Sequence, residues 1–240
     1  MIHDGGKVNT ASVRAAALFL TIVACTWLAR AQFENPDLKS GKAVVRKVIV
    51  LPAEATLVKS GMKGNESLID ESRAVESALP GATAKAMQAK GCDVLDQALS
   101  AEAMKKDPNL SNAAIEIQNR YNEMEPHVFQ KPKDVRKGRF TLGDEVLNFN
   151  PGASADALVF VRAQGVLNTG GKKAFAIVAG GNATDYLAVR IAIVDSQSGA
   201  ILYYGESVET RNFMDPERME AGVERALKDF QGPSPSGKHH

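Results

Sequence analysis

The sequence predicts an α/β fold of the α+β-like kind. We expect a single mixed β-sheet, helices packed mainly on one of its faces, and a helical insert between the second and third strands. Three observations favour this fold. Long runs of β-branched and apolar residues lie at 155–167 and 186–195. A shorter run of the same kind at 42–53 precedes a stretch with helical spacing at 70–90. Strands and helices in this order predict one sheet covered by helices.

The first predicted strand, 42–53, combines β-branched residues with a proline near its end. The segment 57–68 (LVKSGMKGNESL) is predicted to be a loop. In the helix predicted at 70–90, apolar residues recur at helical spacing, and Pro80 is expected to kink the helix or split it in two. A short second strand is expected at 92–96.

The insert, at about 100–150, is predicted to be mainly helical. Ser100 can cap a helix that continues to residue 106. The segment 109–125 has apolar residues on one helical face, and 141–150 begins with a box-like capping sequence that indicates a short helix.

Strands are predicted at 155–167, 186–195 and 200–209, and the turn sequence between the last two predicts a hairpin. Between the first two strands, glycine pairs flank an apolar segment at 174–179 (AFAIVA), which we interpret as core or as an edge hairpin. A final helix is expected at 215–230, because Asp215 and Pro216 form a typical helix start and an apolar stripe follows.

The N-terminus resembles an export signal. Cations precede an apolar run at 15–28, and Ala29-Arg30-Ala31 has the small-x-small pattern of a signal-peptidase site. The run is shorter than the roughly 20 residues that a membrane-spanning helix needs. We therefore expect cleavage after Ala31, so that the mature chain begins at the polar residue Gln32.

A second cleavage site competes with the first. Residues 22–25 (IVAC) resemble a bacterial lipobox, in which Cys25 would carry a diacylglycerol and become the N-terminus. Cleavage after Ala31 is favoured because Trp27 and Leu28 would follow a lipidated Cys25 where a polar tether is usual. The first cut predicts a soluble periplasmic protein, and the second predicts a protein anchored on the periplasmic side of a membrane.

The domain organisation follows from these segments. We expect a signal peptide at 1–31, an N-terminal linker at 32–41, a single α/β domain at 42–230, and a disordered tail at 231–240. Once the signal is removed, the remaining chain is still long enough for one domain with a sizeable core.

The composition argues against several classes of protein. A net charge of +1 and an aromatic content of 6% do not favour nucleic-acid binding. After cleavage at Ala31, Cys92 is the one remaining cysteine, so no intramolecular disulfide is expected. At the start of a predicted strand, Cys92 is interpreted as a small buried residue and not as a nucleophile.

Several segments together resemble a bacterial envelope family. Residues 48–52 (VIVLP), 91–94 (GCDV), 155–157 (ADA) and 194–202 (VDSQSGAIL) match, in this order, the motifs of the family that includes CsgG, LpoB and the N-terminal domain of TolB. The resemblance covers about residues 43–230. It implies the fold, but its motifs carry no reaction.

Candidate catalytic groups are scarce. His127 stands alone, so neither a zinc site nor a histidine-based catalytic set is expected. Asp195 precedes a turn sequence and is interpreted as a turn-stabilising residue. The glycines at 165–171 lack the spacing of a phosphate-binding loop. No cofactor is predicted.

A basic segment within 126–140 is the one candidate partner-binding site, and the alternative is a solvated loop. Its cations are Lys131, Lys133, Arg136, Lys137 and Arg139.

The sequence predicts an exported, non-enzymatic envelope protein. It would bind other envelope proteins as an interaction module or as an accessory in assembly or secretion, and it would contact the membrane only if Cys25 is lipidated. The sequence does not predict its oligomeric state. Two alternatives remain open: an exported enzyme, and a small-ligand binder that uses the glycine-rich loops at 165–185.

Overall fold

A computed structural model describes residues 32–95, 99, 101–143, 146–147, 149, 155–210 and 212–233. Its strands are β1 (Gln32–Glu34), β2 (Lys47–Val50), β3 (Glu54–Gly61), β4 (Gly64–Ser67), β5 (Asp93–Val94), β6 (Ala157–Asn168), β7 (Tyr186–Asp195) and β8 (Ile201–Thr210). Its helices are α2 (Pro36–Lys39), α3 (Ile69–Ala89), α4 (Ala101–Lys106), α5 (Pro108–Gln130), the 3-10 helix η2 (Pro132–Lys137), α6 (Gly170–Val178) and α7 (Pro216–Ala226). The predicted α/β class and the single mixed sheet are confirmed.

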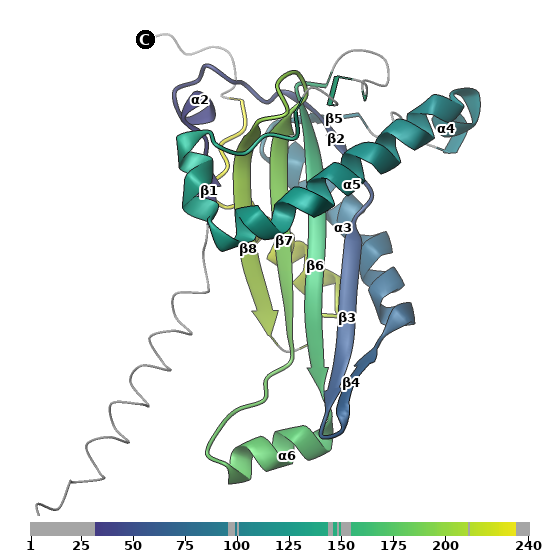
Figure 1. The fold of residues 1–240 in the computed structure, drawn as a ribbon, viewed down its shortest axis with the longest axis vertical. Coiled ribbons are helices and arrows are strands. Elements are labelled where there is room, and N and C mark those ends of the chain that lie inside the picture. Colours follow the sequence, from purple (N-terminus) through teal and green to yellow (C-terminus); the bar gives the residue numbers. More distant parts are fainter. Residues whose placement is uncertain are drawn as a thin grey trace, which may run out of the picture.

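Strand β6 organises the sheet. On one side it pairs antiparallel with β7, which pairs antiparallel with β8, so the predicted hairpin at the end of the domain is confirmed. On its other side β6 pairs in parallel first with β2 and then with β3. The three long strands and β3 extend far beyond β2 and β5, which gives the molecule an elongated shape (Figure 1).

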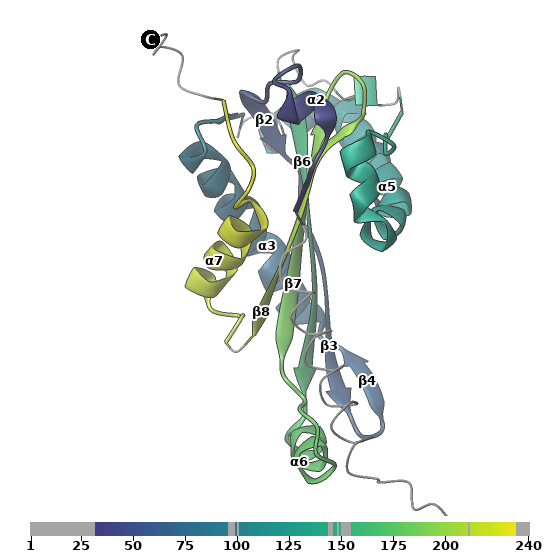
Figure 2. The ribbon, with the colours of Figure 1, turned by 90° about the vertical axis from the view of Figure 1, so that its left-hand side faces the viewer.

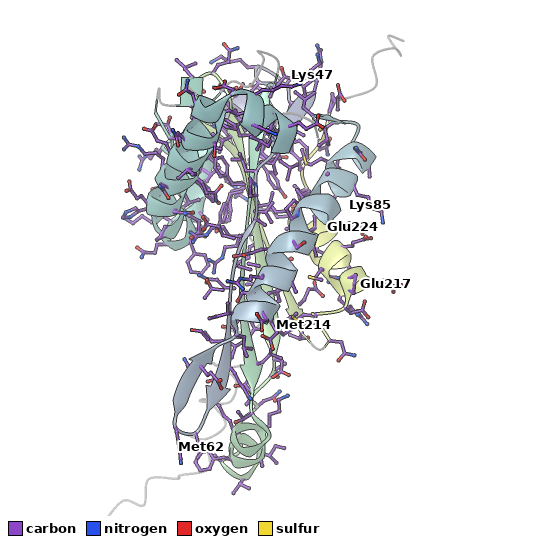
Figure 3. The ribbon with its side chains drawn as sticks, turned by 90° about the vertical axis from the view of Figure 1, so that its right-hand side faces the viewer. Lys47, Met62, Lys85, Met214, Glu217 and Glu224 are labelled. Atoms are coloured by element: carbon purple, nitrogen blue, oxygen red, sulfur yellow. The ribbon has the colours of Figure 1, made fainter. Side chains whose placement is uncertain are left out.

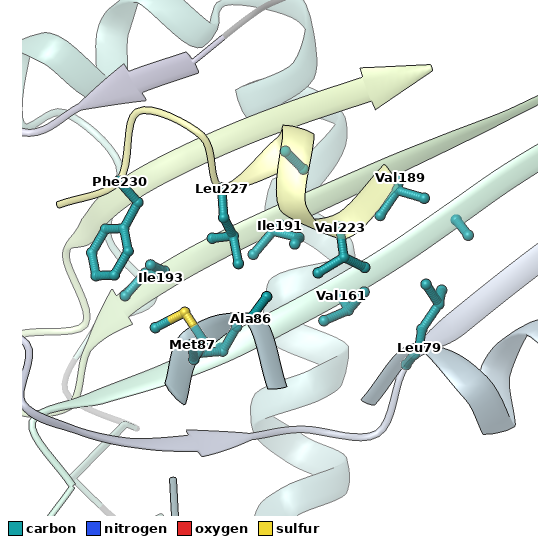
Figure 4. Close-up of a cluster of buried hydrophobic side chains, with 14 of the residues drawn as sticks. Leu79, Ala86, Met87, Val161, Val189, Ile191, Ile193, Val223, Leu227 and Phe230 are labelled. Carbon is teal, nitrogen blue, oxygen red and sulfur yellow. The ribbon is translucent and has the colours of Figure 1, made fainter. Parts of the chain in front are cut away.

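Helices α3 and α7 cover one face of the sheet (Figure 2). Leu79 and Met87 of α3 and Val223 of α7 are completely buried there. Figure 4 shows these side chains against a row of branched residues from the strands: Val161, Val189, Ile191 and Ile193. This packing buries the apolar stripe that the sequence predicts for α3 and α7.

The helical insert covers the other face, where we had expected little helical cover (Figure 2). Tyr121 of α5 stacks on Phe160 of β6, with 4.3 Å between ring centroids, and Ile117 is buried beside them. Both faces of β6 and β7 are apolar in this half of the sheet. Continuous apolar runs, in place of strict alternation, are typical of strands that are covered on both sides.

Two local predictions are wrong. The segment predicted as a loop at 57–68 forms the end of β3 and the strand β4, joined by a tight turn at Met62 and Lys63. It is polar because β4 is exposed along its whole length. The segment 174–179 is neither core nor hairpin. It belongs to α6, which Thr169 caps by accepting a hydrogen bond from the Lys172 N–H.

Other elements differ in extent from their predictions. Helix α3 runs through Pro80 without being split, and α5 continues five residues beyond the predicted 109–125, through Pro126 to Gln130. Residues 32–41, expected to form a linker, include β1 and α2, and β1 pairs with β8.

Some predictions fall outside the described residues. These include the signal peptide 1–31 with Cys25 and Ala31, the capping residue Ser100, residues 144–145, 148 and 150 of the helix predicted at 141–150, and the tail from 234 onward. Among the described helices, none is long and apolar enough to cross a membrane.

Candidate functional site

A row of four charged side chains crosses the sheet on the face that α5 covers. Glu54, Arg162, Arg190 and Glu206 lie on β3, β6, β7 and β8, and each is the direct cross-strand neighbour of the next. Glu125 of α5 lies over the middle of the row. Its two carboxylate oxygens accept hydrogen bonds from Arg190 at 3.1 Å and from Arg162 at 3.4 Å.

The row is held together by ion pairs at both ends. The Arg190 Nε donates to Glu206 at 3.0 Å, and Arg162 lies 3.3 Å from Glu54. Glu125, Arg190 and Glu206 are all buried. Burial by itself would lower the pKa of Arg190, but the carboxylates of Glu206 and Glu125 raise it above its ordinary value. Buried charges are tolerated only when they are paired in this way.

Aromatic side chains enclose this cluster. The Arg190 guanidinium lies 3.9 Å from the centroid of the Phe129 ring. The Tyr204 hydroxyl donates to Glu125 at 3.3 Å. Burial, together with the charge of Glu125, raises the pKa of Tyr121. The phenols are therefore protonated at neutral pH, and the arginines have no proton to exchange. The cluster fastens the C-terminal part of α5 to the sheet.

The charged row was not predicted from the sequence, although the sequence contains a pattern that indicates it. Arg162 and Arg190 each interrupt a run of apolar strand residues. An arginine in a buried strand requires a carboxylate partner, since an unpaired buried charge is too costly. The identity of those partners depends on strand register and on the position of α5.

Beyond the charged row, none of the described helices lies over the same face of the sheet (Figure 2). Pairing places two further rows there, first Thr56, Gln164, Ala188 and Val208, and then Val58, Val166, Tyr186 and Thr210. Most of these side chains are half-buried or exposed, and Tyr186 is 39% exposed. We call these two rows the bare face. It combines branched, aromatic and uncharged polar side chains.

The molecule ends beyond the bare face in a distal tip, which consists of α6 and the β3–β4 turn (Figures 1 and 3). The Lys172 Nζ donates to the Ser60 hydroxyl at 2.5 Å, and Lys173 pairs with Asp185 at 2.7 Å, so α6 is tied to the sheet at its first turn. Burial alone would raise the pKa of Asp185. The hydrogen bonds from Lys173 and from the Asn168 N–H nevertheless hold that pKa below its ordinary value.

The basic segment lies apart from this face and is more ordered than the predicted loop, since α5 and η2 occupy most of it. Lys137 and Arg139 flank Asp134 at 2.9 and 3.8 Å, and the hydrogen bond from Lys137 lowers the Asp134 pKa. Arg136 lies over the Phe33 ring at 4.9 Å.

All five cations of this segment, including Lys131 and Lys133, are exposed. A role in partner binding therefore stays a prediction.

The remaining candidates have structural roles or stand alone. Cys92 is buried, and burial together with the charge of Asp156 raises the pKa of its thiol to about 11, which argues against a nucleophile. Asp195 accepts hydrogen bonds from the Gln197 and Ser198 N–H groups, as expected for a turn. His127 is exposed on α5. No group of three or more metal-ligating side chains occurs within the described ranges.

No protein-family model matches the sequence, and no curated protein is significantly similar to it. Solved structures show distant similarity. The PelC dodecamer from Paraburkholderia phytofirmans has a TM-score of 0.37 and 13% identity over 86% of this chain and 99% of that chain. Lipoprotein GNA1162 from Neisseria meningitidis has a TM-score of 0.35 and 12% identity over 69% of this chain and 80% of its own.

The LpoB C-terminal domain from Salmonella enterica has a TM-score of 0.28 and 12% identity, over 73% of this chain and 94% of that domain. LpoB is one of the proteins whose family the sequence motifs resemble. The similarity between the two structures is distant.

Proposed function

We propose that this protein is an exported, non-enzymatic envelope protein that binds another envelope protein through the bare face, as an accessory in assembly or secretion. The observation that supports this proposal is the abrupt end of helical cover at the charged row. Beyond that row, exposed and half-buried side chains continue along the sheet, and Gln164 and Tyr186 are among them.

The sheet edge beside the bare face supports the same proposal. Strand β1 pairs with β8 only at Tyr203–Gly205, and among the described residues no other strand pairs with that side of β8. The last residues of β8, 206–210, therefore form an edge with backbone groups available for an added strand. A partner could contact the bare face and this edge together.

A photo-crosslinking residue in place of Gln164 tests this proposal in native envelopes. Gln164 is exposed in the middle of the bare face, and its replacement leaves the core untouched. We expect crosslinks to one or a few envelope proteins. The matched control carries the same residue in place of Glu123, which is exposed on the outer side of α5. Equal crosslinking from both positions would contradict a specific partner on the bare face.

Location needs a separate test, because it rests on the N-terminal sequence. We expect the intact mass of the native protein to correspond to a chain that begins at Gln32. A diacylated Cys25 would place the same domain on a membrane anchor, and an intact Met1 would contradict export by a cleaved signal.

Two observations weigh against the alternatives. An enzyme would need titratable groups at an accessible site, whereas the clustered carboxylates are bound by arginines and covered by α5. A ligand binder based on 165–185 would need a cavity beneath those residues. They form the end of β6 and the helix α6, whose largest apolar side chains are exposed.

A further inference from the structure

The distal tip exposes four large apolar side chains. Phe175, Ile177 and Val178 of α6 are 58%, 73% and 87% exposed, and Met62 in the β3–β4 turn is 63% exposed. Figure 3 shows Met62 at the end of the molecule, beside α6. These exposed side chains therefore lie on two neighbouring elements at one end of the molecule.

The charges around this end are mostly positive. The lysines are Lys59, Lys63, Lys172 and Lys173, and the carboxylates are Glu66 and Asp185. The sequence has no acidic residue from Gln164 to Thr184, a stretch that includes all of α6. Lys172 and Lys173 lie in the first turn of α6, next to the sheet, while the apolar residues follow toward its end. The distal tip therefore carries lysines beside exposed apolar side chains.

Lysines beside exposed apolar side chains fit a lipid surface better than they fit a protein. Lysine ammonium groups pair with phosphate headgroups while neighbouring apolar side chains enter the acyl boundary. Protein interfaces, by contrast, are depleted of lysine. Helix α6 has nine residues, too few to span a bilayer. Such a helix can only lie in the interfacial layer.

We propose that the distal tip docks on an anionic phospholipid membrane, with Ile177 and Val178 inserted below the phosphates. This docking does not depend on the partner of the bare face.

Vesicle flotation tests this proposal with the chain that begins at Gln32, which contains every described element and no lipid anchor. The probe is a vesicle of phosphatidylethanolamine and phosphatidylglycerol. We expect binding that falls at least about tenfold when Ile177→Asp and Val178→Asp are combined. Replacement of exposed Lys63 by Gln should lower it about fivefold, since one lysine near an anionic surface contributes about 1 kcal/mol. A nitrobenzoxadiazole label on Ile177→Cys should shift its emission to shorter wavelength.

The matched controls are Ile115→Asp and Lys105→Gln. Ile115 is 57% exposed on α5, and Lys105 is exposed on α4. Neither control should change flotation, and circular dichroism should show that every variant is folded. The proposal is wrong if the wild-type chain fails to float, or if the tip variants and the controls behave alike. Loss of self-association or of a partner protein in the tip variants, without lipid binding in the wild type, would assign the tip to a protein instead.

Discussion

The two halves of the long strands differ in what covers them. From the start of β6 to the charged row, the sheet lies between α5 on one face and α3 with α7 on the other. Beyond the row, the face below α5 is bare, and the strands lead to the distal tip. The covered half follows the ordinary logic of a hydrophobic core, whereas the distal half exposes side chains that a core would bury. This contrast is the reason why we expect the covered half to contribute most of the stability, and why the proposed binding surfaces lie in the distal half.

The charged row marks the boundary, and its position has a physical reason. Where α5 ends, solvent can approach the sheet, and a side chain there must be compatible with partial hydration. Arginine and glutamate meet this requirement because their stems pack on the strands while their heads pair. The row therefore lies at the edge of the core between α5 and the sheet, at the strand position where the cover by α5 ends.

Removal of a charge from this boundary should have the largest effect. Arg190→Met leaves Glu125 and Glu206 buried without their shared partner, so we expect a loss of about 3–5 kcal/mol in the free energy of unfolding, measured by urea denaturation. The control is Arg73→Met, which breaks an exposed pair with Asp70 and should cost less than about 1 kcal/mol. Similar losses in both variants would contradict a boundary held by buried ion pairs.

Truncation of an apolar side chain should destabilise the fold in the covered half and have little effect in the distal half. Leu79→Ala creates a cavity between α3 and the sheet, and we expect it to destabilise the fold by about 2–5 kcal/mol. Ile177→Ala removes an exposed side chain at the distal tip and should change stability by no more than about 0.5 kcal/mol. Equal thermal shifts for the two variants would mean that the distal tip is part of the core.

The smallest effect is expected from the ion pair that ties α6 to the sheet. The folded-state pKa of Asp185 lies below its ordinary value of about 3.9. The pair with Lys173 therefore contributes stability above that ordinary pKa, and the contribution is lost as the pH falls through the lower folded-state value. Asp185→Asn should remove this part of the acid dependence. Denaturation of the wild type and of the Asp185→Asn variant from neutral to acidic pH measures this contribution. Parallel curves of the free energy of unfolding against pH would show that the pair contributes nothing.

Local sequence signals were sufficient for the elements that form the covered half. The β-branched runs of β6, β7 and β8 predicted those strands, and the turn after Asp195 predicted their hairpin. The predicted helix start at Asp215 is confirmed, because its side chain accepts a hydrogen bond from the Glu217 N–H. In each case the residues that determine the element lie within one turn or one strand of each other.

The elements of the distal half were predicted wrongly because their environment depends on residues that are distant in the chain. The apolar segment at 174–179 reads as core by composition, yet α6 lies beyond the end of the sheet, where no other layer reaches it. The polar segment 57–68 reads as a loop, yet β3 continues because β6 provides a parallel partner for it. Hydropathy cannot distinguish an apolar residue that the fold buries from one that a partner or a membrane buries.

By itself, the sequence determined the class of fold, the order of most of its strands and helices, and an N-terminus with the features of an export signal. Tertiary structure alone decided that Arg162 and Arg190 meet Glu54, Glu125 and Glu206, because these residues are far apart in the chain and strand register brings them together. It also decided which half of the sheet stays bare. The length of α5 and its crossing of the sheet set that limit, and neither is encoded by a local pattern.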